Sequence, residues 1–421
     1  MTTPPMTPVD QGRPRGFAET ATPSRSNGQG QPGAEAPVDL AAGLGGSDSG
    51  TRGTEKLFVT RPLLPPLGEF LPYLEEIWAS QTLTNGGPMH QRLEGALAER
   101  LGVRHISLFA NGTLALSTAI RALGLRGEVI TTPYSFVATT HALVRAGLEP
   151  VFVDIDPISL NLDPARIEEA ITPRTSGILP VHCYGMPCDV ATIGELAAVR
   201  GLRVLYDAAH AFGVCLPGRN LLECGDCSAL SFHATKVFNT GEGGAVVTSD
   251  PALKRYIDRL KNFGFVDEVT VNETGLNAKM SEITAALGLL QLKYVDAALR
   301  RRSEIDRRYR ERLADIPGIT CVAAGAWEGA NHSYFPILVG DGFRLSRDGL
   351  YRHLAAHGIY GRRYFHPLIS QFPMYCGLAS AQPSRLPVAT RIASQVLCLP
   401  IYPTLSDTDI DRVVDCIHKG R

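Results

Sequence analysis

The sequence predicts an α/β fold in which helices cover a mostly parallel sheet, followed by a smaller α+β domain. Short apolar segments alternate with helical ones between residues 106 and 248, which is typical of parallel sheets covered on both faces. The 421 residues allow a large core, and the hydrophobic fraction of 44% is ordinary for a globular protein.

Residues 1–55 are expected to form a disordered tail. They are rich in Pro, Gly, Ser, Thr and Ala, and Phe17 is their only aromatic residue. Such a segment buries too little apolar surface to offset the entropy lost on ordering. We therefore expect order to begin near Leu57, with a large domain over residues 56–300 and a small domain over 301–421.

The elements of the large domain follow from apolar spacing. Helical spacing predicts helices over Leu67–Ala79 and Pro88–Leu101. Seven strands are then expected, at Ile106–Ala110, Glu128–Thr132, Pro150–Ile155, Gly177–His182, Arg203–Asp207, Ala229–His233 and Ala245–Thr248. Helices are expected between the early strands at Leu114–Leu123, Ala138–Ala146 and Ile193–Val199.

The pattern changes after the last of these strands. A long helix is expected from Ser281, with one apolar face at Ile283, Leu287, Leu290 and Tyr294. The charged segment Leu299–Arg312 predicts a solvated helix. The small domain is expected to contain a strand at His332–Val339 and helices at Arg347–Ala355 and Asp407–His418.

Composition excludes several classes of protein. The net charge of −1 gives no electrostatic reason to expect nucleic acid or an acidic membrane as a partner. No apolar run is long enough to span a bilayer, and the first residues lack the apolar core of a secretory signal. The nine cysteines are expected to be reduced thiols in a cytoplasmic protein, and the single C-x-x-C pair, Cys224 and Cys227, predicts no metal site.

Three segments carry residues suited to chemistry. Asn111-Gly112-Thr113 lies between a strand and a helix, and Thr113 is the expected N-cap of that helix. The free N–H groups of the first helical turn could bind an anion, but the segment could also be a simple turn. Asp207 ends a strand at the edge where parallel sheets bind ligands, although a structural carboxylate fits equally well. Lys236 follows a strand in a Gly-rich setting, where burial would favour the neutral amine that forms imines; a lone lysine is more often solvated.

Five motifs occur in one order along the chain: Asn111-Gly112-Thr113, Pro133-Tyr134-Ser135-Phe136, Asp207-Ala208-Ala209-His210, Ser231–Lys236 and Gly275-Leu276-Asn277. Together they resemble the DegT/DnrJ/StrS family of nucleotide-sugar aminotransferases. The resemblance extends from about residue 57 to the C-terminus. It implies fold type I of the pyridoxal 5′-phosphate (PLP) enzymes, the aspartate-aminotransferase fold.

The resemblance also implies how the cofactor is held. Lys236 forms the Schiff base with PLP, Asp207 pairs with the pyridinium nitrogen, and Phe136 stacks on the ring. The phosphate is held by Ser231 and by the amides of Gly112 and Thr113.

The resemblance implies roles for two further residues, His210 and Asn277. His210 stands near the ring hydroxyl, where the family usually has Gln. Asn277 matches a residue that reaches the phosphate from the neighbouring subunit, which implies a homodimer with shared active sites. Many members follow this asparagine with an aromatic residue and Arg, whereas this chain has Ala278 and Lys279.

The substrate follows from a closer resemblance. Residues 59–66, 131–141 and 260–265 resemble the branch that makes dTDP-4-amino-4,6-dideoxyglucose from dTDP-4-keto-6-deoxyglucose, with L-glutamate as the expected amino donor. The branch that aminates dTDP-3-keto-6-deoxyhexoses shares much of this pattern and stays open. Such sugars feed antibiotic glycosides or surface polysaccharides. His182, which fits a core histidine equally well, and His366 are weaker candidates for substrate contact.

Two other functions remain as alternatives. Related PLP-dependent sugar dehydratases have histidine in place of the lysine, so Lys236 argues against that reaction. A non-catalytic PLP-binding regulator would need a DNA-reading module, and the N-terminal segment has too few apolar residues to fold into a helix-turn-helix.

Overall fold

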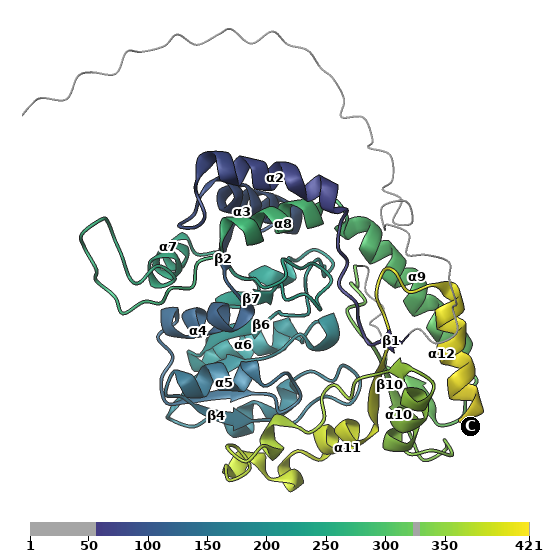
Figure 1. Ribbon diagram of the computed structural model, residues 1–421. Coiled ribbons are helices and arrows are strands. Elements are labelled where there is room, and N and C mark those ends of the chain that lie inside the picture. Colours follow the sequence, from purple (N-terminus) through teal and green to yellow (C-terminus); the bar gives the residue numbers. More distant parts are fainter. Residues whose placement is uncertain (1–55, 323–328, 421) are drawn as a thin grey trace, which may run out of the picture. The chain divides into compact units, whose positions relative to one another are not determined.

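A computed structural model describes residues 56–322 and 329–420. The expected tail, residues 1–55, lies outside the described residues. A seven-stranded sheet forms the centre of the described chain, in the order β2-β8-β7-β6-β5-β3-β4 (Figure 1). Its strands are β2 (His105–Phe109), β3 (Glu128–Thr131), β4 (Glu149–Phe152), β5 (Thr175–Leu179), β6 (Arg203–Asp207), β7 (Cys227–Ser231) and β8 (Gly244–Thr248).

Strand direction confirms the predicted mostly parallel sheet. Only β8 runs antiparallel to its neighbours, β2 and β7, and the remaining pairs are parallel. The carboxyl ends of β2, β3, β5, β6 and β7 therefore meet at one edge of the sheet. Ligands of open parallel sheets bind at such an edge.

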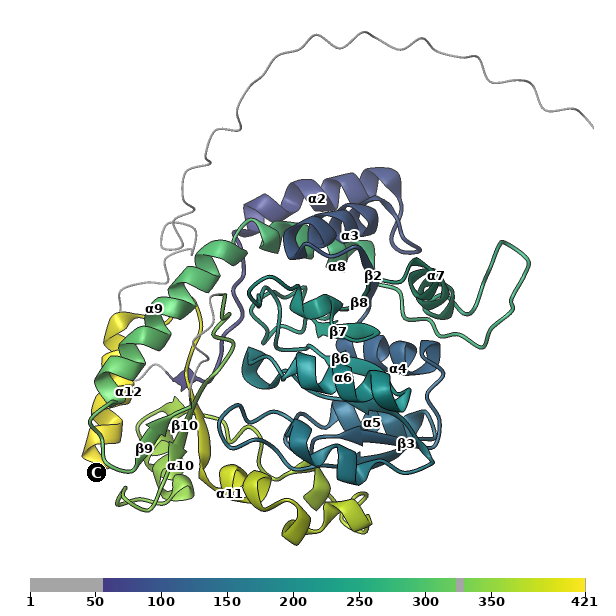
Figure 2. The same cartoon turned by 180° about the vertical axis from the view of Figure 1, so that it is seen from behind.

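Helices cover both faces of this sheet. One core joins it to α4 (Gly112–Ala122), α5 (Ala138–Arg145) and α7 (Pro251–Leu260). A second core, on the opposite face, joins it to α3 (Pro88–Leu101), α6 (Val190–Arg200) and α8 (Glu282–Leu292), with α2 (Leu67–Ser80) packed outside them. Figure 2 shows α6 in front of the sheet when the molecule is seen from behind.

The C-terminal part has a sheet and a core of its own. Its antiparallel strands lie in the order β12-β10-β9. The strands are β9 (Ile319–Cys321), β10 (Phe335–Val339) and β12 (Val396–Leu399), and the helices are α9 (Val295–Leu313), α10 (Arg347–Ala356), α11 (Pro387–Gln395) and α12 (Asp407–Lys419). The first described strand, β1 (Leu57–Phe58), also belongs here, because it pairs with β11 (Ile359–Tyr360).

The region after Ser281 differs from the prediction. Helix α8 ends at Leu292 and α9 begins at Val295, so Tyr294 lies between two helices. The predicted apolar face is confirmed only in part: Leu290 and Tyr294 are buried, whereas Ile283 is 41% exposed. A small residue also faces α3: a Cβ on Gly288 would lie 2.7 Å from Leu93 Cδ2, so a larger residue there would force the Leu93 side chain to shift.

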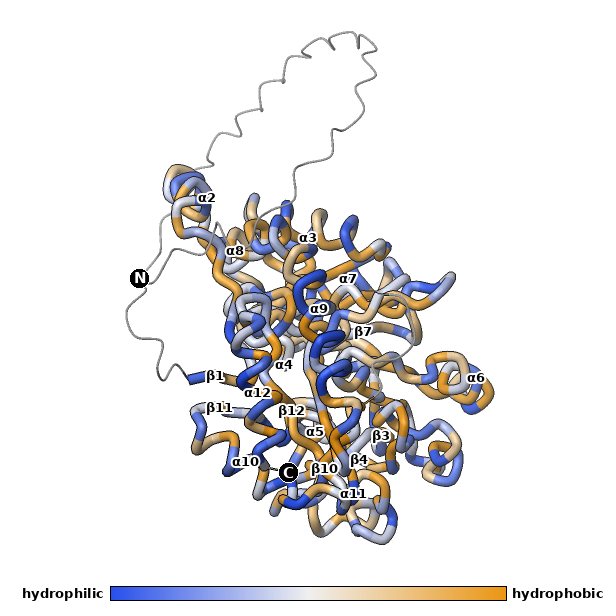
Figure 3. Tube along the Cα trace, turned by 90° about the vertical axis from the view of Figure 1, so that its right-hand side faces the viewer, coloured by the Kyte–Doolittle hydropathy of each residue, from blue (hydrophilic) through white to orange (hydrophobic). Residues whose placement is uncertain are grey.

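Helix α9 corrects a second expectation. Figure 3 shows it as mostly hydrophilic, in agreement with its charged sequence. However, Ile305, Tyr309 and Leu313 recur on one side and are buried in the C-terminal core. The charged residues thus cover one face of a packed helix rather than a fully solvated one.

The N-cap of α4 differs from the predicted one. The helix begins at Gly112, and its N-cap is Asn111 rather than Thr113. Asn111 has an extended backbone, and its Oδ1 accepts the N–H of Leu114 at 2.9 Å. Asparagine is among the best N-caps because its short side chain reaches a free N–H of the first turn.

None of the helices in the described part of the chain combines the length and apolar character that a membrane span requires.

Candidate active site

A cavity of about 1050 Å³ opens at the edge where the parallel strands end. Segments that follow β2, β3, β6 and β7 supply one side of it. The predicted residues that line it are Gly112, Thr113, Phe136, Asp207, His210, Ser231 and Lys236. The sheet therefore brings together residues that are up to 124 positions apart in the sequence (236 − 112).

Asp207 lies on the floor of the cavity at the end of β6. Its Oδ2 accepts the hydroxyl of Thr139 at 2.8 Å, and its Oδ1 accepts the N–H of Ala209 at 3.1 Å. Burial raises the pKa of this carboxyl, while both hydrogen bonds and the charge of Lys236 favour the ionised form. A buried carboxylate oriented in this way suits a cationic ring nitrogen.

Lys236 lies in the turn after β7. Burial lowers the pKa of its amine to about 8, and the carboxylate of Asp207 opposes that shift. Its Nζ lies 3.5 Å from the hydroxyl of Tyr334. An amine with this pKa is neutral often enough at physiological pH to act as a nucleophile or a base.

The first turn of α4 forms a cradle whose free N–H groups are suited to an anion. The N–H groups of Gly112 and Thr113 lack intrahelical acceptors, as at any helix N-terminus. A Cβ on Gly112 would lie 2.9 Å from Ser231 Cβ, and one on Gly244 would lie 2.7 Å from the Gly112 nitrogen. Both glycines are therefore needed for the helix start to approach the ends of β7 and β8.

His210 faces the cavity with a defined tautomer. Its Nδ1 accepts the backbone N–H of Tyr184 at 3.1 Å, and burial lowers its pKa well below the ordinary value. The neutral ring consequently carries its proton on Nε2. Its ring also packs against Tyr334 and Phe365, with centroids 4.9 and 6.0 Å away.

Aromatic residues of the C-terminal part close another side of the cavity. Tyr334, Tyr364 and Phe365 line it, and no motif in the sequence marks the first of them. The other two directly precede His366, which was singled out instead. Thr139, which orients Asp207, was also missed, although it lies three residues after Phe136.

Three predicted residues lie elsewhere among the described part of the chain. His182 is fully buried, stacks on Tyr206 with centroids 4.7 Å apart, and does not line the cavity. Burial lowers its pKa to about 3. His366 is exposed beside the cavity wall, and Asn277 is exposed next to Leu276, which does line the cavity.

The residues present fit PLP on structural grounds. An anion cradle, a carboxylate, an exposed aromatic ring and a buried amine all line one cavity, as the phosphate, ring nitrogen, ring face and aldehyde of that cofactor require. Together with the sheet topology, this arrangement is typical of PLP-dependent transferases.

Comparisons with known proteins agree. Residues 68–418 match the DegT/DnrJ/EryC1/StrS aminotransferase family. The chain is 55% identical over 363 residues to dTDP-4-amino-4,6-dideoxy-D-glucose transaminase of Shigella dysenteriae, covering 86% of this chain and 98% of that one.

Two solved structures extend the comparison. DesI in the presence of its TDP-sugar product is 39% identical, with a TM-score of 0.83 over 87% of this chain and 93% of that one. NtdA of Bacillus subtilis with bound cofactor PMP is 30% identical, with a TM-score of 0.76 over 84% and 81%.

The chain belongs to the DegT/DnrJ/EryC1/StrS aminotransferase family. It is an aminotransferase with fold type I, and its cofactor is pyridoxal phosphate.

Proposed function

We propose that this enzyme aminates dTDP-4-keto-6-deoxy-D-glucose at C4, with L-glutamate as donor, to give dTDP-4-amino-4,6-dideoxy-D-glucose and 2-oxoglutarate. The observation that carries the proposal is the buried amine of Lys236 in a cavity with the Asp207 carboxylate and the α4 cradle. The choice of sugar is supported by the transaminase of that name, which is 55% identical over nearly its whole length.

Each cavity residue has a proposed role in holding the cofactor. Lys236 binds it covalently, and Asp207 pairs with its ring nitrogen. The ring rests on Phe136, while the phosphate is held by Ser231 and by the first turn of α4. His210 donates from Nε2 toward the ring hydroxyl, since its Nδ1 is occupied by the N–H of Tyr184.

The chain's own residues then move the proton. When bound, pyridoxal phosphate supplies an electron sink that makes the adjacent C–H bond acidic. Nζ of Lys236, once the amino donor has released it, accepts that proton and returns it at the neighbouring carbon. Its pKa of about 8 suits both directions of transfer. Tyr334, Tyr364 and Phe365 exclude water from that side of the cavity.

A homodimer is part of the proposal. Residues 262–277 form an arm that projects away from the sheet beside α7 (Figure 1), held by isolated bridges between Asn262 and Asn277 and between Phe265 and Val271. Its exposed apolar side chains are Phe263, Phe265, Val266, Val269, Val271 and Leu276. An apolar arm beside the cavity is well suited to pack on a second copy and to carry Asn277 into that copy's active site.

The reaction is proposed to take place in the cytoplasm. All nine cysteines are free thiols in the structure. Free thiols are typical of a reducing compartment.

A paired assay tests the choice of sugar. The enzyme is incubated with glutamate and either dTDP-4-keto-6-deoxyglucose or a dTDP-3-keto-6-deoxyhexose, and the products are identified by mass spectrometry and NMR. We expect an amine at C4 of the first sugar. Amination of the 3-keto sugar alone would contradict the proposal.

A substitution tests the anchor of the site. Lys236→Ala should lower turnover by at least about a thousandfold, because both the covalent attachment and the base are lost. The absorbance of lysine-bound cofactor should disappear as well. Lys293→Ala, at an exposed lysine outside the cavity, serves as the matched control and should keep both properties.

A further inference from the structure

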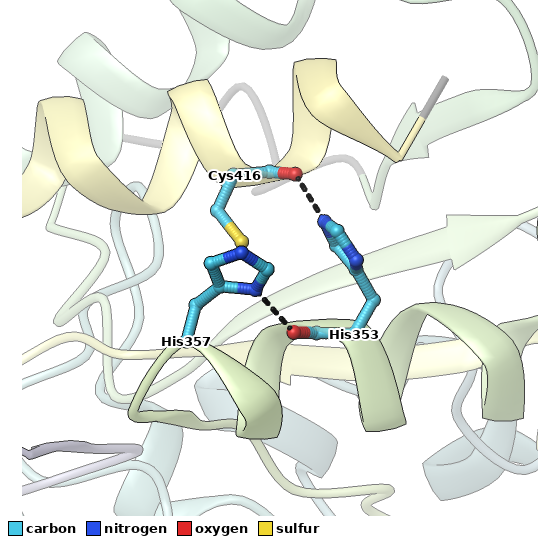
Figure 4. A group of neighbouring side chains, drawn as sticks. All are labelled: His353, His357 and Cys416. Atoms are coloured by element: carbon cyan, nitrogen blue, oxygen red, sulfur yellow. Dashed lines mark hydrogen bonds between the residues drawn. The ribbon is translucent and has the colours of Figure 1, made fainter.

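Two histidines and a cysteine converge in the C-terminal part, and none of them lines the active-site cavity. His353 lies on α10, His357 is the C-cap of that helix, and Cys416 lies on α12. A ring nitrogen of each histidine and the sulfur of Cys416 all lie within 4.8 Å of one another. Figure 4 shows the sulfur next to the His357 ring, between the two helices.

Backbone carbonyls orient both rings. Nδ1 of His357 lies 2.8 Å from the carbonyl oxygen of His353, so Nδ1 carries the proton and Nε2 keeps its lone pair. Nε2 of His353 donates to the carbonyl oxygen of Cys416 at 3.1 Å, so Nδ1 of this ring keeps the lone pair. Carbonyl partners of this kind orient the histidines of metal sites.

The surrounding elements hold the three side chains in register. Arg412, one turn before Cys416 on α12, donates to the carbonyl oxygen of His357 at 2.5 Å and so ties the end of α10 to α12. Gly358 has a φ of +75° and turns the chain away directly after His357. Cys416 is buried whereas His357 is exposed, so an ion can enter from solvent and still find a sheltered thiol.

The donor set selects the kind of ion. Two imidazoles and a thiolate suit zinc, whereas magnesium and calcium prefer oxygen ligands. In a tetrahedral zinc site the ligand atoms lie roughly 3.3–3.8 Å apart, so the cluster must contract by about 1 Å. The His357 side chain is exposed, so a small shift of its ring can supply that adjustment, and three protein ligands leave a fourth position for water.

We propose that His353, His357 and Cys416 form a zinc site that clamps α10 to α12. The site is separate from the aminotransferase reaction and does not depend on it. Zinc displaces the proton of the Cys416 thiol, which is released to solvent, so binding strengthens as the pH rises. The bound ion stabilises the folded C-terminal part, because the unfolded chain does not hold the three ligands together.

The test uses the holoenzyme and zinc alone, in competition with a chromophoric chelator. The wild-type chain should bind one ion. His357→Gln should weaken binding by at least about tenfold, since even partners outside the ligand set are worth that much in metal sites. His418→Gln changes an exposed histidine of α12 outside the cluster and should bind zinc as the wild type does.

Cobalt(II) gives a second readout. A thiolate-to-cobalt charge-transfer band should appear in the wild type and be absent in Cys416→Ser, with cofactor absorbance removed by subtracting the ion-free holoenzyme. Cys416 is buried, so its variant is compared only if its thermal transition matches the wild type; otherwise His357→Gln decides alone. Equal zinc affinity in the wild type and His357→Gln, or a cobalt spectrum without the thiolate band, would overturn the proposal.

Discussion

At the scale of single residues, the chemistry of Lys236 depends on burial. Only the neutral amine attacks an aldehyde, and burial lowers the pKa of this amine to about 8. We expect the apoenzyme to bind pyridoxal phosphate about fivefold faster at pH 8 than at pH 7, with the rate levelling above that range. Stopped-flow absorbance measures this rate.

Asp207 provides the control for this pH profile. Its carboxylate raises the pKa of Lys236, so Asp207→Asn should move the midpoint of the profile to lower pH. A rate that keeps rising through pH 10 in the wild type would show that the amine is not desolvated.

His210 stands where the family resemblance leads us to expect a glutamine. A glutamine can accept the N–H of Tyr184 and still donate toward the cavity, as the His210 ring does. His210→Gln should therefore keep kcat/KM within about threefold, whereas His210→Phe, which can do neither, should lose roughly tenfold or more. Steady-state kinetics with saturating cofactor separates these outcomes; equal losses in both variants would refute the hydrogen-bonding role.

Short motifs let the sequence identify residues that line the cavity. Asp207, Ser231 and Lys236 sit at strand ends or in the following turn, and the parallel sheet brings those ends together. Tyr334 could not be found in this way. It reaches the cavity only because the C-terminal part packs against the sheet, and no local pattern encodes that contact.

At the scale of elements, the start of α4 depends on Gly112. A Cβ there would lie 2.9 Å from Ser231 Cβ and 3.3 Å from Ser231 Cα, so the helix start would have to move. Gly112→Ala should cost about 1–3 kcal/mol of unfolding free energy and weaken cofactor binding about tenfold or more. Denaturant unfolding and cofactor titration measure the two effects.

Gly95 is the matched control for this substitution. It lies in helix α3, and a Cβ there would meet no atom within 4 Å. Gly95→Ala should leave cofactor binding unchanged and stabilise the protein by up to about 1 kcal/mol, because alanine favours helix. If both variants bound cofactor equally well, the close approach of α4 to Ser231 would not matter for the cradle.

Long periodic elements were predictable, and tightly packed or short ones were not. Helix α3 has the predicted bounds because a proline begins it and Gly102 ends it. The buried residues of α8 include Ala285, Ala286 and Gly288, which a search for large apolar residues overlooks. Strands such as β9, with three residues, are too short for alternation to mark them.

At the scale of the whole molecule, the proposed dimer makes each active site a shared structure. Mixed dimers of Lys236→Ala and Asn277→Ala chains, isolated with two different tags, contain one site with both residues intact if Asn277 acts on the partner. Such dimers should show about half of the wild-type activity, while each parent variant is nearly inactive.

The same experiment distinguishes the opposite arrangement. If Asn277 served its own chain, neither site of a mixed dimer would be complete and no activity would return. Light scattering at the assay concentration confirms that the species measured is a dimer.

The pairing of β1 with β11 has a consequence for how the described chain unfolds. Leu57 lies in the C-terminal core, although the next helices cover the large sheet. A further core joins Phe152 of that sheet to Ile392 of α11, and Asp154 accepts two N–H groups at the start of the same helix. The backbone thus enters the C-terminal part, leaves it and returns. Dividing the chain at one position would therefore not separate the C-terminal part from the large sheet. Melting of either part removes buried contacts from the other, which favours one cooperative transition over two.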